Sequence, residues 1–173
     1  LSESTALACA AIDGTGAIIE WFQSLEAAGR VYRMDNDGVT FWAAAERLSL
    51  LRPVYPEAVF EPALPDHLLE SNNSEEENVR EDNIFSVLRG WVECSGPLTA
   101  TELVQSLGIP RDDIVYALGR LENEGVVLRG SFRTDVEEEE FCDRRILSRI
   151  HRSTIDTLRR EVEPAPPSAF MRF

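Results

Sequence analysis

The fold expected for this chain is decided by residues 96–132, GPLTATELVQSLGIPRDDIVYALGRLENEGVVLRGSF. Thr99 and Glu102 have the spacing of a capping box, which predicts a short helix that ends near Gly108 and Pro110. After this turn the apolar residues recur every three or four positions, as expected for a second helix with one buried face. The pattern is therefore typical of a helix-turn-helix connection.

The second helix has a recognisable end. Its inward face is formed by Ile114, Leu118 and Leu121, and Gly125 fits the left-handed conformation that often ends a helix. From Val126 to Phe132 the period changes to that of an extended strand. The sequence thus predicts a helix followed directly by the first strand of a wing.

The segments on either side complete a winged helix. A preceding helix presents Ile84, Leu88 and Trp91 on one face and ends at Gly96-Pro97, and 140–142 are expected to form the second wing strand. Three helices and a two-stranded wing over 83–142 define a winged helix. The predicted fold class is therefore mainly α with small β wings, an α+β protein.

The chain contains an internal repeat, because AIIEWFQSLEAAGRVYR (17–33) aligns with DIVYALGRLENEGVVLR (113–129). The coincident residues are Ile18 with Ile114, Leu25 with Leu121, Glu26 with Glu122, Gly29 with Gly125, Val31 with Val127 and Arg33 with Arg129. In the first copy we expect the middle helix at 4–11, the third helix at 17–28 and a wing at 30–42. Its first helix is missing, which predicts that the chain begins inside a longer protein.

The expected organisation is a tandem of two winged-helix modules. It comprises a partial winged helix at 1–52, a Pro-rich and then acidic connector at 53–82, a winged helix at 83–142, an Arg-rich helix at 143–163 and a truncated C-terminal segment at 164–173. Part of the acidic stretch, around Asn72 to Asn83, is a candidate for a mobile loop.

Composition excludes several classes of function. The 31 acidic residues outnumber the 17 basic ones, for a net charge of −14, which argues against wrapping nucleic acid or an anionic membrane over the whole surface. All basic residues are Arg, so a Walker-type loop, which needs Lys, is absent. No membrane span or leader is evident, and we expect a cytoplasmic protein.

The spacing of Cys and His that metal sites and nucleophilic catalysis require is also missing from the sequence. Cys9, Cys94 and Cys142 lack a CxxC pair and are expected to be buried free thiols, and His67 and His151 have no partner at ligand spacing. We predict no metal and no cofactor in this chain, and we assign no catalytic residue.

Two further groups have ordinary explanations. The three tryptophans, Trp21, Trp42 and Trp91, occupy apolar positions of predicted helices or strands and are expected in the core. The acidic run 137–140 is expected to be a solvated wing loop, because contiguous exposed acids have no reason to differ in pKa.

Candidate contacts to nucleic acid are residues that could bind phosphate or stack on bases. On the Arg-rich helix they are Arg144, Arg145, Arg149 and Arg152, and on the third helix and wing they are Tyr116, Arg120, Arg129 and Arg133. The third helix also carries acids, so reading of the major groove by it is disfavoured. For the Arg-rich helix an ion-pair face against another protein surface is an equal alternative; its apolar side, with Ile146, Leu147, Ile150, Ile155 and Leu158, is expected to face the protein.

Two stretches resemble a known family. FWAAAERLSLLRPVYPEAVFEPALP (41–65) and FCDRRILSRIHRSTIDTLRREVEPAPPSAFMRF (141–173), with GPLTATEL and GVVLRGSF between them, are similar to the region behind the motor domains of bacterial large helicase-related (Lhr-type) proteins. The acidic insertion at 74–82 departs from the family pattern.

The resemblance implies that the parent is a superfamily 2, ATP-dependent 3′-to-5′ translocase and helicase. Such a parent acts on single-stranded DNA or RNA:DNA hybrids in DNA repair and uses ATP and Mg²⁺ in two RecA-like domains. This chain would be a noncatalytic accessory part of it.

Three hypotheses remain open from the sequence. The chain helps to hold or orient a single strand beside the motors, or it is a packing module whose arginines dock on the RecA-like domains. A third hypothesis, an enzyme of glycosylase type, rests on fold analogy alone, because the sequence nominates no buried carboxylate or nucleophile.

Overall fold

The computed structural model describes residues 15–64 and 77–161 of the chain. The first part contains helix α2 (Thr15–Ala27), strands β1 (Val31–Asn36) and β2 (Val39–Ala44), a 3-10 turn (Ala45–Arg47), helix α3 (Leu48–Val54) and strand β3 (Val59–Glu61). The second part contains α5 (Glu77–Val92), β4 (Leu98–Thr99), α6 (Ala100–Leu107), α7 (Arg111–Asn123), β5 (Val127–Gly130), β6 (Glu140–Asp143) and α8 (Arg144–Glu161). The expected middle helix at 4–11 and the segment 164–173 lie outside the described residues.

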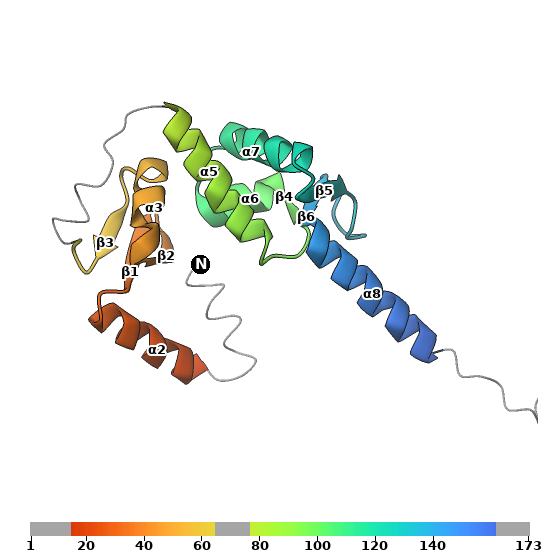
Figure 1. Cartoon of the computed structure of the whole chain (residues 1–173), viewed down its shortest axis with the longest axis horizontal. Helices are drawn as coiled ribbons and strands as arrows, with labels where there is room; N and C mark the ends of the chain where they lie inside the picture. Colours follow the sequence, from red (N-terminus) through yellow and green to blue (C-terminus); the bar gives the residue numbers. More distant parts are fainter. Residues whose placement is uncertain (1–14, 65–76, 162–173) are drawn as a thin grey trace, which may run out of the picture.

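The strands form two small antiparallel sheets, one in each part (Figure 1). In the first sheet the order is β2-β1-β3, and in the second it is β4-β6-β5. In the second sheet Leu128 lies opposite Cys142, and Leu98 lies opposite Phe141. Helices dominate the described residues, so the expected mainly helical α+β class is confirmed.

The sequence signals of the second part are confirmed in detail. Thr99 and Glu102 form a capping box at the start of α6, and Gly108 ends this helix with φ +65°. The predicted inward face of α7 is fully buried, and Gly125 adopts φ +69° directly before β5. Local capping and apolar periodicity therefore decide these elements.

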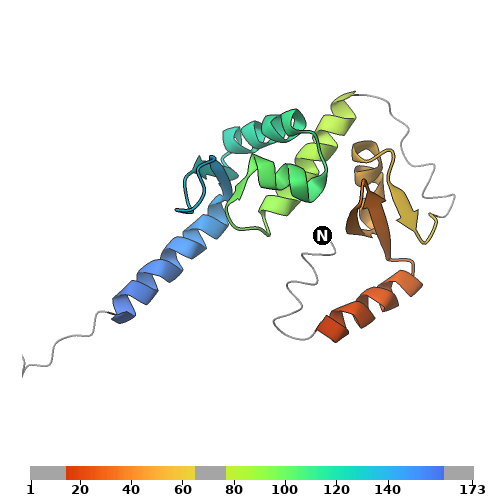
Figure 2. The same cartoon turned by 180° about the vertical axis from the view of Figure 1, so that it is seen from behind.

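The two parts share one hydrophobic core. Helix α3 packs against α5, and buried residues of both parts belong to one cluster (Figure 2). The buried phenol of Tyr55 donates a hydrogen bond of 2.9 Å to the carbonyl oxygen of Leu107, the last residue of α6. This bond satisfies one of the carbonyls that every helix end leaves without an intrahelical donor.

Within the segment expected as a connector (53–82), the Pro-rich half contributes residues to helix α3 and to strand β3. Val54 and Tyr55 are buried, and β3 pairs with β1 through Met34 opposite Phe60. The helix α5 likewise begins at Glu77, inside the acidic half. The high proline content of 53–65 predicted a connector and gave no sign of these buried residues. Pro53 lies in the last turn of α3, and apolar residues between the prolines enter the core.

Three burial expectations are wrong. Trp21 is 67% exposed, because the neighbouring Phe22 takes the inward position of α2 and stacks on the half-buried Trp42 with ring centroids 4.2 Å apart. Cys94 is exposed, whereas Cys142 is buried as expected. Ile150 and Leu158 of α8 are 42% and 55% exposed, because this helix extends away from the body.

We expect Tyr55→Phe to lower the free energy of unfolding by about 1–2 kcal/mol, because it leaves the buried carbonyl of Leu107 without its donor. Urea unfolding followed by circular dichroism measures this change. The matched control is Tyr116→Phe, since Tyr116 is 60% exposed and its hydroxyl can bond to water in both states. Equal stability of both variants would contradict the assigned role of Tyr55.

Candidate nucleic-acid interface

Helix α8 is fixed to the second sheet by its first residues. The carboxylate of Asp143, the last residue of β6, accepts hydrogen bonds from the backbone N–H of Arg145 at 2.7 Å and of Ile146 at 3.2 Å. The backbone N–H of Arg144 donates to the carbonyl of Val126 at 3.0 Å. Asp143 is buried, so the helix is both capped and anchored where it leaves the sheet.

Beyond this anchor the helix carries a row of arginines. Arg145, the second residue of the helix, pairs with Glu93 at 3.1 Å and with Asp143 at 3.6 Å. The other five arginines of α8 are exposed, and no ion pair joins them to a residue within 15–64 or 77–161: Arg144, Arg149, Arg152, Arg159 and Arg160. At 1.5 Å per residue these five guanidinium-bearing positions extend over about 24 Å.

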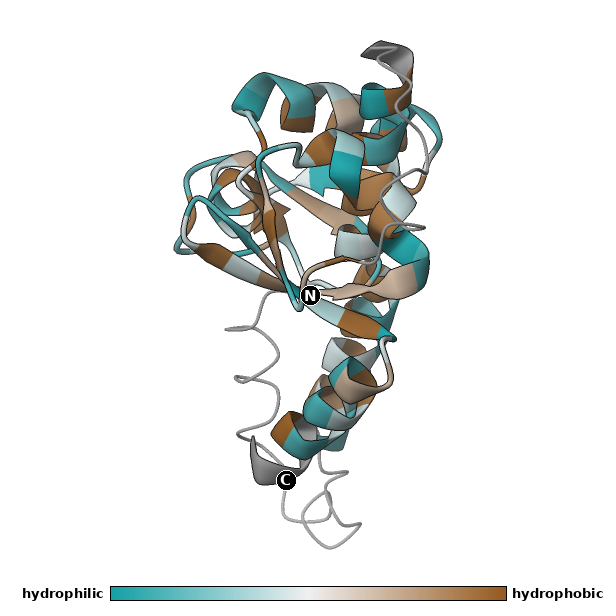
Figure 3. Cartoon of the chain, turned by 90° about the vertical axis from the view of Figure 1, so that its left-hand side faces the viewer, coloured by the Kyte–Doolittle hydropathy of each residue, from teal (hydrophilic) through white to brown (hydrophobic). Residues whose placement is uncertain are grey.

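The arginines and the apolar residues of α8 lie on different sides of the helix. At 100° per residue, Arg149, Arg152 and Arg160 fall within one sector, and Ile150 and Leu158 point away from it. Figure 3 shows that hydrophilic and hydrophobic residues alternate along the helices of the chain. One side of α8 is therefore a basic, solvated row.

The candidate arginines of α7 and the wing, unlike most of those on α8, are paired with carboxylates. The guanidinium of Arg120 pairs with Asp82 and lies 4.2 Å above the ring of Phe85, and the hydrogen bond that it donates to Asp82 raises the pKa of Arg120. Arg129 lies between Glu122 at 3.3 Å and Glu139 at 3.4 Å. Carboxylates thus compete with phosphate at both positions.

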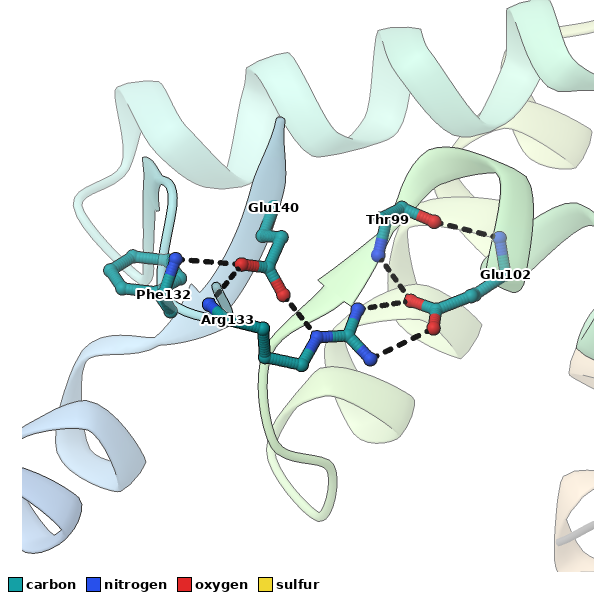
Figure 4. A network of polar contacts seen from close by, with 5 residues as sticks. All are labelled: Thr99, Glu102, Phe132, Arg133 and Glu140. Carbon is teal, nitrogen blue, oxygen red and sulfur yellow. Dashed lines mark hydrogen bonds and ion pairs between the residues drawn. The ribbon is translucent and has the colours of Figure 1, made fainter. Parts of the chain in front are cut away.

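Arg133 joins the wing to the start of α6 (Figure 4). Its two terminal nitrogens donate to the two carboxylate oxygens of Glu102 at 2.9 and 2.7 Å, and its Nε donates to Glu140. These contacts raise the pKa of Arg133, while its hydrogen bonds lower the pKa of Glu102 to about 2. The bidentate geometry indicates a structural clamp.

The clamp contains a carboxylate that sequence reasoning missed. Glu140 was expected in a solvated loop, but it is fully buried. Burial alone raises its pKa, yet the backbone N–H groups of Phe132 and Arg133 donate to it at 2.6 and 2.7 Å, and with the Arg133 side chain they lower the pKa overall. The signal available in the sequence was its position as the first residue of a predicted strand.

Tyr116 lies on the outer face of α7, where it is 60% exposed. The hollow beside it, lined also by Glu81, Ile84, Asp113 and Ala117, has a volume of about 40 Å³, which is room for one or two water molecules and not for a substrate. Residues 15–64 and 77–161 contain no cluster of three or more potential metal ligands. No helix among them is long and apolar enough to cross a membrane.

The eight candidate residues therefore do not form one surface. Arg144, Arg145, Arg149 and Arg152 share the projecting helix, whereas Tyr116 and Arg120 lie on α7, which packs on α5 (Figure 1). Arg129 and Arg133 belong to the carboxylate-rich wing. The assignment of all eight to nucleic acid stays a prediction, and the arrangement favours the arginines of α8.

A comparison with curated proteins gives one informative relative. The chain is 29% identical over 161 residues to the protein of Mycolicibacterium smegmatis called Lhr helicase/probable uracil glycosylase. It is similar to part of a helicase. The match covers 93% of this chain and 10% of the relative, so the chain spans about a tenth of the length of that Lhr helicase. No protein-family model and no solved structure matches the chain.

We expect Glu102→Gln to lower the free energy of unfolding at pH 7 by about 1 kcal/mol, after allowance for the exposure of its pair with Arg133. The pKa of Glu102 lies below the ordinary glutamate value of 4.5, so the stabilisation by its charge is present above that pH and is lost as the pH falls toward about 2. The two proteins should therefore become equally stable near pH 2.

Thermal unfolding between pH 2 and 7 measures this difference. Glutamine keeps the side-chain acceptor of the capping box, so the substitution isolates the charge. Asp135→Asn, on the exposed wing, is the control and should leave the pH profile unchanged. A difference between Glu102→Gln and the native chain that stayed constant down to pH 2 would exclude the charge as its cause.

Proposed function

We propose that this chain is a noncatalytic accessory segment of a larger ATP-dependent helicase or translocase, in which α8 binds the phosphates of a single nucleic-acid strand. The observation that carries the proposal is the row of exposed arginines on α8 that have no ion pair within the described residues. Guanidinium groups bind phosphate oxygens without reading bases, which suits a protein that must act on any sequence.

We infer that the two parts are tandem winged-helix modules, and the order of their elements supports this inference. In the second part the order is helix, strand, two helices and two strands, with the short β4 beside the wing strand β6. In the first part α2 and the β1-β2 hairpin repeat the order of α7 and the β5-β6 hairpin. Winged helices occur both as nucleic-acid readers and as packing modules.

The distribution of charge favours α8 over the usual reading helix. The arginines of α7 and the wing are paired with acids, and the third helix carries Asp112 and Asp113 in its first turn. The chain as a whole has a net charge of −14, so its affinity for nucleic acid must come from a local contact. Such a contact gains free energy because arginines displace the counterions bound to the phosphates of the nucleic-acid strand. The strand would lie along α8 and avoid the acidic wing.

The parent protein would supply the remaining parts of the activity. From the resemblance we infer an ATP-dependent, 3′-to-5′ superfamily 2 motor that uses Mg²⁺ and acts on DNA or RNA:DNA hybrids in DNA repair. The relative from Mycolicibacterium smegmatis supports the helicase part of this inference. The chain itself would orient the strand beside the motors.

A second candidate is a packing role, in which the arginines of α8 dock on acidic surfaces of the RecA-like domains. The ion pairs of Arg145 with Glu93 and Asp143 favour this possibility, because they show the same helix bound to protein carboxylates. In that case the isolated chain would not bind nucleic acid.

The test is binding of the chain to a fluorescent single-stranded oligonucleotide across a salt series. If five arginines contact phosphates, log K should fall with log salt with a slope of about −3.5, at about 0.7 per contact. Replacing Arg149 and Arg152 by Gln removes two of these contacts, so the slope of log K against log salt should change from about −3.5 to about −2.1.

The matched control replaces Arg111 and Arg129 by Gln. These two arginines are also exposed and change the net charge equally, but each is paired with a glutamate of the wing. We expect the control to keep the native slope. An equal loss of oligonucleotide affinity in both double variants would show that only the net charge of the chain matters. Absence of binding by the native chain would favour the packing role.

A further inference from the structure

The loop between β5 and β6 is acidic, and two of its carboxylates lie against arginines of the same module. The loop contains Asp135 and the run 137–139. Glu138 pairs with Arg111 at 2.8 Å, and Glu139 pairs with Arg129 at 3.4 Å. The wing thus places its own anions on guanidinium groups, which are the side chains best suited to bind phosphate.

The pair between Arg111 and Glu138 belongs to a small anion site. Arg111 is the first residue of α7; one of its terminal nitrogens donates to the hydroxyl of Thr101 on α6 at 2.7 Å, and the other donates to Glu138 at 2.8 Å. Hydrogen bonds from Arg111, and then from Thr101, lower the pKa of Glu138, so its carboxylate is ionised at neutral pH. A guanidinium group beside a hydroxyl group is a donor set that also binds phosphate oxygens.

The loop is fixed at both ends without the help of Glu138. Arg133 and Glu140 bind each other, and Arg133 also binds Glu102, in the clamp of Figure 4. The side chains of Arg111 and Glu138 are instead 54% and 35% exposed, and ion pairs as accessible as this contribute little to stability. Movement of 134–139 away from Arg111 therefore breaks no contact of the clamp.

We propose that Glu138 is an internal competitor of phosphate. It occupies the anion site of Arg111 and Thr101, and this site binds a backbone phosphate of a nucleic-acid strand when the wing loop moves away. The inference shares its ligand with the proposed function of α8 but shares none of its residues. The wing would thereby regulate how tightly the second module holds a strand.

The charges around Arg111 limit the site to a single contact. Asp113 is neutralised by Arg80 at 2.8 Å, whereas Asp112 has no ion pair within 15–64 or 77–161. The carboxylate of Asp112 repels a strand that continues along α7. The site therefore takes one phosphate and reads no base.

The test compares Glu138→Gln with Glu137→Gln in the salt series with the fluorescent single-stranded oligonucleotide. Both substitutions remove one negative charge from the same loop, but Glu137 has no ion pair within the part of the chain that the structure describes. Glu138→Gln should change the slope of log K against log salt from about −3.5 to about −4.2, because one further phosphate contact forms. Glu137→Gln should keep the native slope.

A second substitution shows whether the additional contact is made by Arg111. The double variant Glu138→Gln/Arg111→Gln should return to the native slope. Arg111→Gln alone should leave the native slope unchanged, because Glu138 already occupies Arg111 in the native chain. Arg111, Glu137 and Glu138 are all outside the core, so circular dichroism should report an unchanged fold for each variant.

Three results would overturn the proposal: equal slopes for Glu138→Gln and Glu137→Gln, a steeper slope that survives Arg111→Gln, or no oligonucleotide binding by Glu138→Gln. Calorimetric binding of inorganic phosphate by Glu138→Gln, without a steeper slope for the oligonucleotide, would identify a site for free phosphate and overturn the assignment to nucleic acid.

Failure of the proposed function of α8 gives a different result. In that case the native chain binds no oligonucleotide, while Glu138→Gln still shows the single contact of Arg111, with a slope of about −0.7. Loss of steepness in Arg149→Gln/Arg152→Gln reports on α8 alone. The two proposals are therefore tested separately by the same measurement.

Discussion

The four-residue strand β6 is the constraint on which the rest of the second part depends. Three of its side chains are buried: Glu140, Cys142 and Asp143. Glu140 holds the wing through two backbone N–H groups and Arg133, and Asp143 caps the helix that follows. Burying two carboxylates is unfavourable unless N–H donors surround them, and both have such donors here. The wing and α8 therefore take their directions from the two ends of one strand.

This anchoring has a functional consequence for the arginines. Acids outnumber arginines almost two to one in the chain, and in the second part every arginine outside α8 has a carboxylate partner: Arg80, Arg89, Arg111, Arg120, Arg129 and Arg133. In helix α8, Arg145 of the first turn pairs with Glu93 and Asp143, whereas Arg149, Arg152, Arg159 and Arg160 further along have no ion pair within the described residues. An arginine without a carboxylate partner can bind phosphate without first breaking an ion pair. The arginines further along α8 therefore remain free to bind phosphate, whereas Arg145 near its start is held by protein carboxylates.

In the proposed function, the chain would serve a motor without supplying a catalytic group. Among the described residues, the buried carboxylates Glu140 and Asp143 have structural partners, the hollow beside Tyr116 is too small for a substrate, and the proposed contacts of the arginine row would read no base. Binding through phosphates alone lets a strand slide, which a translocating enzyme requires.

The sequence by itself determined the elements whose signals are local. The capping box of Thr99 and Glu102, the apolar period of α7 and the left-handed Gly125 all predicted what the structure contains, because backbone hydrogen bonding and side-chain periodicity act over a few residues. Only the tertiary structure decided that Tyr55 enters the core, that Trp21 stays exposed, that Glu140 is buried and that Arg133 is clamped while Arg149 is not. Each of these outcomes depends on which residue from a distant part of the sequence lies next to the side chain in space. The residue type alone does not tell whether an arginine meets a carboxylate or water, or whether an apolar side chain enters the core.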